Sequence, residues 1–241
     1  MTHTSVRHSP ASSRHGGARA TASAAGILYL LTIAASIPAQ FILYQPVLAD
    51  RQYVLSAGAD TRVLWGGLFE VVTALACIGT AVVLFPTLKR HHEGAALGFV
   101  AARVLEAALI VTGIVSLLSV VSLRDASATG PHADSLVTAA RALVAVHDWT
   151  FLLGPGLMPG VNALLLGSVL YRSALVPRII PAMGLVGAPL ILVAGAATLV
   201  GVNEQVSVWT AIATLPIFAW ELSLGLWLTA KGFTPAASTP R

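Results

Sequence analysis

Residues 95–123 read AALGFVAARVLEAALIVTGIVSLLSVVSL and contain only two ionisable side chains, Arg103 and Glu106. A helix of about 20 apolar residues crosses the hydrocarbon core of a bilayer, so this segment is long enough to span it. The two charged residues stand three apart and therefore leave the same helix face. An ionised group at bilayer depth costs at least about 2.5–3.5 kcal/mol, so we expect this face to turn toward the protein interior.

The composition excludes a water-soluble domain. Of the 241 residues, 56% are hydrophobic and only 10% are charged, and the mean hydropathy is +0.81. The apolar residues form six long blocks, and lipid leaves the backbone of each block no partner outside its own helix. The sequence therefore predicts an all-α, polytopic bundle of six transmembrane helices, at residues 21–44, 63–85, 95–123, 135–171, 179–200 and 206–230.

The remaining segments define the predicted domain organisation. Residues 1–18 are polar and small and predict a disordered cytoplasmic tail, 19–232 form the six-helix transmembrane domain, and 233–241 form a short polar C-terminal tail. The fourth block contains Gly154-Pro155-Gly156 and Pro159-Gly160. Two prolines flanked by glycines predict that helix four is broken between Gly154 and Gly160.

Basic residues between the blocks predict the orientation. Nine lie on one side and four on the other: Arg7, Arg14, Arg19, Lys89, Arg90, Arg172, Arg178, Lys231 and Arg241 against Arg51, Arg62, Arg124 and Arg141. Because positive loops stay inside, both termini are predicted to be cytoplasmic. The net charge of +4 therefore reflects membrane topology, and we exclude nucleic acid as a partner.

Few polar residues lie within the blocks, and they predict a buried site. Glu106 and Glu221 fall near the middle of their spans and Arg103 lies close by, whereas Glu70 lies in the outer half of helix two. These four residues are the candidate polar site. His147, Asp148 and Asn162 in helix four are second-rank candidates. The single cysteine, Cys77, is interpreted as a small buried residue.

Three functions are compatible with such a site. A small-solute or proton-coupled carrier is favoured by the interrupted fourth helix, because broken helices beside polar cavities mark binding sites in carriers. An accessory or structural membrane subunit would use the buried charges only to hold its helices together. An intramembrane hydrolase is the third possibility. However, His147 is the only histidine within a predicted span, and the chain has no hydrolase motif. We predict no catalytic residue, metal or cofactor.

Three stretches carry a resemblance to a known family. They are Ala18-Arg19 with the segment AGILYL at 25–30, GSVLYRSALVPR at 167–178 followed by GLVG at 184–187, and ELSLGLWLTAKGF at 221–233. Together they resemble the bacterial membrane family called domain of unknown function 4386. The resemblance implies six helices in the bacterial inner membrane, and it brings no established activity. A lipid bilayer is the expected surrounding, with a second copy or another membrane subunit as a partner.

Overall fold

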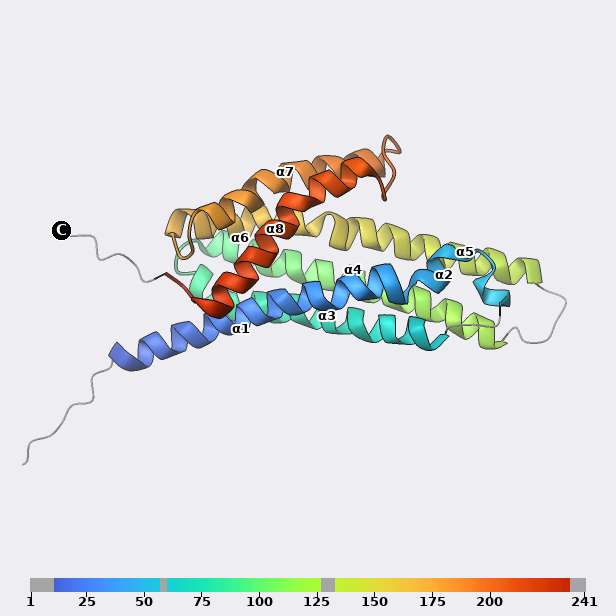
Figure 1. The fold of residues 1–241 in the computed structure, drawn as a ribbon, viewed down its shortest axis with the longest axis horizontal. Coiled ribbons are helices and arrows are strands. Elements are labelled where there is room, and N and C mark those ends of the chain that lie inside the picture. The colour runs from blue at the N-terminus through green and yellow to red at the C-terminus, as the bar shows by residue number, and fades with distance from the viewer. Residues whose placement is uncertain (1–10, 57–59, 127–132, 235–241) are drawn as a thin grey trace, which may run out of the picture.

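The computed structural model describes residues 11–56, 60–126 and 133–234, and every regular element in those ranges is helical (Figure 1). Within them, six helical segments are long and apolar enough to cross a membrane: Gly17–Leu43, Asp60–Leu88, Glu93–Arg124, Ala133–Ser173, Ile179–Leu199 and Val208–Ala230. The predicted all-α fold with six spans is therefore confirmed.

The elements follow the chain in order. They are α1 Ala11–Pro38, η1 Ala39–Leu43, α2 Gln45–Ala49, η2 Tyr53–Leu55, α3 Asp60–Leu88, α4 Glu93–Ala126, α5 Ala133–Phe151, η3 Leu152–Gly156, α6 Met158–Ser173, α7 Ile179–Leu199 and α8 Val208–Ala230. The segments η1 and η3 are π-helices and η2 is a 3₁₀-helix. Two of the spans therefore contain a π-helical turn.

The spans pack as a closed ring. Helix α3 packs against α1 and α4, α4 against α6, α6 against α7, and α7 against α8, which returns to α1. Figure 1 shows α7 and α8 beside each other, with α8 crossing α1 obliquely. A closed ring gives each span an inner face, and the charged residues of the spans can be sheltered there from lipid.

Close approach of α7 and α8 depends on a glycine. A Cβ atom built on Gly184 would lie 2.6 Å from the ring of Trp220, which is fully buried. Trp220 therefore fills the space that a side chain at position 184 would occupy. Small residues allow membrane helices to approach in this way.

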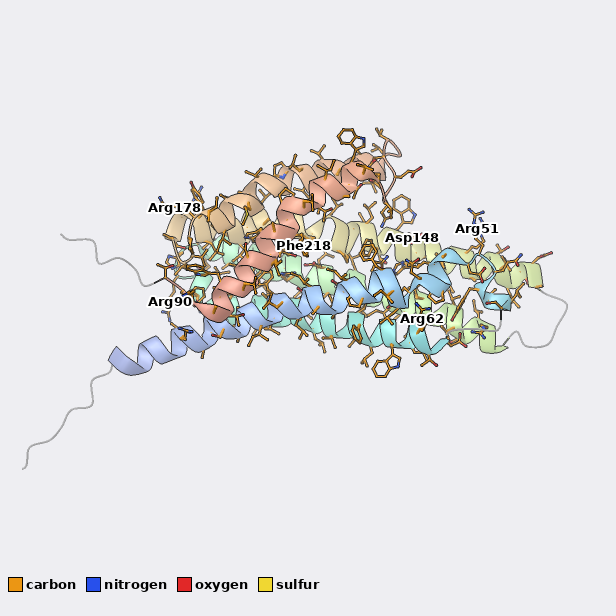
Figure 2. All side chains as sticks on the ribbon, viewed as in Figure 1. Arg51, Arg62, Arg90, Asp148, Arg178 and Phe218 are labelled. Atoms are coloured by element: carbon orange, nitrogen blue, oxygen red, sulfur yellow. The ribbon has the colours of Figure 1, made fainter. Side chains whose placement is uncertain are left out.

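The outer faces of the spans are apolar. Val193 of α7 is 69% exposed, Leu75 of α3 is 64% exposed and Val82 of α3 is 61% exposed. Figure 2 shows side chains projecting outward along the whole length of the bundle. A soluble monomer rarely exposes so much contiguous apolar surface, so these faces are suited to contact with lipid.

The two ends of the chain differ from the predicted tails. Helix α1 begins at Ala11, so residues 11–18 of the expected disordered tail are helical, and residues 1–10 lie outside the described ranges. At the other end, Phe233 packs on the main core and the Thr234 amide donates to the Leu175 carbonyl at 2.7 Å. Residues 235–241 are outside the described ranges.

At the predicted break in helix four, the chain changes from α-helix to the π-helix η3 and then resumes as α6. Pro155 lies inside η3 and Pro159 lies in the first turn of α6. Proline has no amide hydrogen, and the first turn of a helix leaves such donors unpaired in any case. The interruption is thus a π-helical turn rather than a loop, and Ala133–Ser173 counts as one candidate span.

The first turns of α1 and the last turn of α8 lie at the same end of the bundle (Figure 1). Arg19 of α1 donates from Nη2 to the Ala230 carbonyl at 2.9 Å and so caps the end of α8. The opposite end carries α2 and η2. This arrangement is what an even number of spans requires.

Candidate functional site

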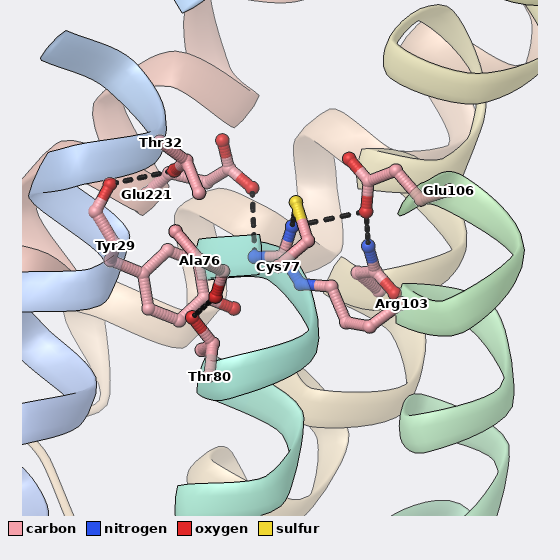
Figure 3. A network of polar contacts seen from close by, with 9 residues as sticks. Tyr29, Thr32, Ala76, Cys77, Thr80, Arg103, Glu106 and Glu221 are labelled. Atoms are coloured by element: carbon pink, nitrogen blue, oxygen red, sulfur yellow. Dashed lines mark hydrogen bonds and ion pairs between the residues drawn. The ribbon is translucent and has the colours of Figure 1, made fainter. Parts of the chain in front are cut away.

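Arg103 occupies the centre of the ring. It lies on α4, its side chain is 2% exposed, and it is among the largest fully buried side chains. The residues around it come from α1, α3, α4, α6 and α8, as Figure 3 shows for most of them. A guanidinium at this depth requires partners, because an unpaired buried charge is costly.

Glu106 is the closest partner of Arg103. Arg103 Nη1 donates to Glu106 Oε2 at 3.0 Å, as the spacing of three residues along one helix predicts. Asn162 of α6 donates from Nδ2 to the same oxygen at 2.8 Å and is fully buried. One carboxylate oxygen therefore joins α4 to α6.

Glu221 of α8 is the second acid beside Arg103. Its Oε1 atom lies 3.8 Å from Arg103 Nη2, which is within ion-pair distance but too long for a hydrogen bond. The Glu221 side chain is 15% exposed, against 6% for Glu106. Two carboxylates thus face one guanidinium, and Glu221 is the more loosely held of the two (Figure 3).

Aromatic rings and a thiol complete the surroundings of the guanidinium. Arg103 Cζ lies 4.8 Å from the Tyr29 ring centroid and 5.8 Å from the Phe99 centroid, which are cation–π distances. Tyr29 in turn meets Trp220 edge to face at 6.4 Å. Arg103 Nη1 also lies 3.5 Å from Cys77 Sγ, and Cys77 is 1% exposed, so its interpretation as a buried residue is confirmed.

Some buried polar atoms in this cluster have no hydrogen-bond partner among the described residues. These atoms are Arg103 Nε and Nη2, Asn162 Oδ1, the Tyr29 hydroxyl and Trp220 Nε1. A buried donor or acceptor left unpaired costs about 1–3 kcal/mol, and more when it is charged. The cluster therefore keeps unused hydrogen-bonding capacity.

The structure brings together Arg103, Glu106, Glu221 and Asn162 from the predicted set. It places Glu70 elsewhere, in a narrow cavity that His147 also lines. His147 Nδ1 lies 3.3 Å from Asp148 Oδ1, and the Asp148 side chain is 55% exposed. The candidate residues thus form two groups, one around Arg103 and one around Glu70 and His147.

Sequence reasoning missed Tyr29 and Phe99 as contacts of Arg103, and Tyr44 and Gln40 as residues lining the Glu70 cavity. Tyrosines and a glutamine within apolar blocks were the available signal, since such side chains require a polar partner when buried. Among the residues that the structure describes, no three His, Cys, Asp or Glu side chains group as a metal site would require.

The comparisons with known proteins place the chain in a family. No curated protein and no solved structure matches it. The sequence profile described as Domain of unknown function (DUF4386) matches residues 24–232, which is nearly the whole described region and includes every residue of the Arg103 and Glu70 groups. This protein therefore belongs to the family described as Domain of unknown function (DUF4386).

Proposed function

We propose that the chain is a multi-pass protein of the bacterial inner membrane with both termini in the cytoplasm, and that it is a proton-coupled carrier of a small polar solute. The Arg103 cluster is its coupling site. Glu221 is the residue that gains and loses the proton.

This proposal is supported by the different contacts that the Arg103 guanidinium makes with Glu106 and with Glu221. Glu106 accepts hydrogen bonds from both Arg103 and Asn162, so it is fixed in place as the counter-ion. Glu221 stands 3.8 Å from Arg103 Nη2 with no hydrogen bond between them, and it is partly exposed. One guanidinium balances the charge of one carboxylate, which is Glu106. Protonation of Glu221 therefore costs less free energy than protonation of Glu106.

The unpaired atoms support a polar solute at the same place. Arg103 Nε and Nη2 are two donors, and Asn162 Oδ1 is an acceptor. A solute with a hydroxyl or carboxyl group complements these atoms, and binding would relieve the cost of leaving them unpaired. Protonation of Glu221 would remove its electrostatic attraction for Arg103 Nη2 and leave that donor to the solute, which couples the proton to the solute.

Infrared spectroscopy on the protein in lipid tests the proton step. After a step to lower pH, we expect the carbonyl band of a protonated carboxylic acid to appear in wild type. One such band should be absent in Glu221→Gln and present in Glu204→Gln, whose side chain is exposed on a loop. Retention of every wild-type carboxylic acid band in Glu221→Gln would refute proton exchange at this residue.

One observation favours an accessory or structural subunit as the alternative. The Arg103–Glu106–Asn162 bonds join α4 to α6, and Glu221 adds α8, so the cluster also fastens the ring. In that role Glu221 would never exchange protons with bulk water. The infrared experiment therefore separates the two functions.

A further inference from the structure

A second polar cavity lies closer to the α2 and η2 end of the bundle than the Arg103 cluster does. It has room for about one water molecule. Both π-helical turns reach it, through Gln40 of η1 and Pro155 of η3. Such turns are rare and are frequently found at functional sites. The other lining residues are Tyr44, Glu70, Leu109, Ile110, Gly113, Ile114, His147, Thr150 and Phe151.

Two buried polar groups in this cavity have no protein partner. Glu70 is 8% exposed, and no hydrogen bond or ion pair joins its carboxyl group to another described residue. Tyr44 is 1% exposed and its hydroxyl is also unpaired. A carboxylate without a partner at this depth is expensive, and a bound proton is the simplest way to remove its charge.

His147 connects the cavity to the exterior. Its ring is held between the Tyr44 ring, at 5.7 Å between centroids, and the Phe151 ring, at 6.2 Å. Its Nδ1 atom faces the Asp148 carboxylate, which lines a second, wider cavity together with Arg51 and Arg141. Figure 2 shows Asp148 and Arg51 toward the same end of the bundle.

We propose that Glu70 is a proton-binding site that is filled from the α2 and η2 end through Asp148 and His147. A proton from bulk water reaches the imidazole at Nδ1, beside Asp148. The imidazole releases a proton from Nε2 into the cavity, where a single water passes it to the Glu70 carboxylate. Histidine suits this step because it can accept a proton on one nitrogen and release one from the other.

The groups that face Glu70 agree with this assignment. Tyr44 faces it from the end of η1 and His147 from α5, and the residues of α4 that line the cavity are apolar. Gln40 and Thr150 are polar without being titratable. Arg51 and Arg141 line the outer cavity and not this one. No described cation is therefore placed to hold Glu70 in its charged form.

Time-resolved infrared spectroscopy after a pH step tests the site. We expect one carboxylic acid band to be missing in Glu70→Gln and retained in both Glu221→Gln and the loop control Glu204→Gln. Glu70→Gln keeps the shape of the side chain and removes an unpaired carboxylate, so it is expected to fold. The Glu70→Gln and Glu221→Gln variants identify their infrared bands independently. Failure of this proposal is therefore distinguishable from failure of the proposed function.

The route has its own test. In His147→Ala, the Glu70 band should form at least about 100-fold more slowly, the low end of what a positioned proton donor contributes. Added imidazole should restore the rate by entering the space left by the side chain. If His147→Ala does not fold, His147→Gln replaces it, without the rescue step. A Glu70→Gln spectrum identical to wild type would overturn the site, and proton uptake at the wild-type rate without His147 would overturn the route.

Discussion

A double-mutant cycle on Arg103 and Glu106 tests whether their contact is a full ion pair. The variants are Arg103→Met, Glu106→Leu and the combination of both. Methionine and leucine roughly preserve side-chain volume, so the cavity contribution is kept small and the charge contribution dominates. Each single change leaves the partner charge buried, at 2% exposure for Arg103 and 6% for Glu106.

The expected magnitude follows from the contacts. Removing one partner of a buried pair costs about 3–5 kcal/mol. Glu221 stands 3.8 Å from Arg103 and partly replaces Glu106, so we expect the lower end of that range, about 3 kcal/mol, for Glu106→Leu. The double variant strands no guanidinium and should be more stable than either single variant. The coupling free energy should then exceed about 2 kcal/mol, above the largest value of about 1.7 kcal/mol for hydrogen bonds between membrane helices.

Equilibrium unfolding in mixed micelles, followed by tryptophan fluorescence, gives the four free energies of unfolding. Arg103→Met combined with Glu70→Gln is the matched control, because no ion pair joins these two residues and their effects should add. Coupling under about 0.5 kcal/mol between Arg103 and Glu106, the scatter of independent sites, would refute the ion pair as an energetic unit.

Three further predictions concern the frame around the sites. Gly184→Ala places a Cβ atom 2.6 Å from the Trp220 ring and should lower the free energy of unfolding by about 1–3 kcal/mol. The control Gly17→Ala, with nothing within 4 Å of its Cβ, should not lower it. Equal melting temperatures of the two variants would contradict the tight α7–α8 contact. Burial and the hydrogen bond to Asp60 raise the pKa of Tyr53, in the η2 connection, to about 12. Because the folded state holds this proton more tightly, the stabilisation should be full below pH ~10 and decline as pH rises toward 12. An absorbance titration of the tyrosines that is unchanged in Tyr53→Phe would disprove this shift. Arg19→Met removes the cap on the Ala230 carbonyl and should speed hydrogen exchange in the last turn of α8, with unchanged exchange counting against the cap.

The spans and the shared helix face of Arg103 and Glu106 were predictable because both are local, whereas the sequence left open which of Glu70, Glu106 and Glu221 pairs with Arg103. Hydrophobic length alone locates a span, and a spacing of three residues places two side chains on one face. The mid-depth positions of Glu106 and Glu221 also brought them to one level of the bundle, where the structure pairs each with Arg103. The orientation of the termini relative to the cytoplasm stays a prediction from the basic residues.

Glu70 lies apart from Arg103 because the two residues stand at different levels along the bundle. Glu70 and Cys77 lie seven residues apart on α3, so they share a face but stand about 10 Å apart along the axis. Cys77 is level with Arg103, whereas Glu70 is level with His147 and Tyr44. The sequence placed Glu70 in the outer half and named His147 as a second-rank candidate, but it could not pair them. The rotation of α5 relative to α3 is set by packing between helices and not by either helix alone.

The same faces of α3 and α4 therefore pass two polar sites in succession, and the buried side chains between them are mostly apolar, with Thr73 as a polar exception. Ala74, Cys77, Ala107, Ile110 and Ile114 form a buried cluster whose members lie along α3 and α4 at and between the two levels. Among the described residues, no hydrogen bond or ion pair joins Glu70 to Glu221. A carrier requires such a barrier to prevent a leak, and it must also be able to open it. The two π-helical turns beside the Glu70 cavity are the places where α1 and the α5–α6 span depart from α-helix geometry.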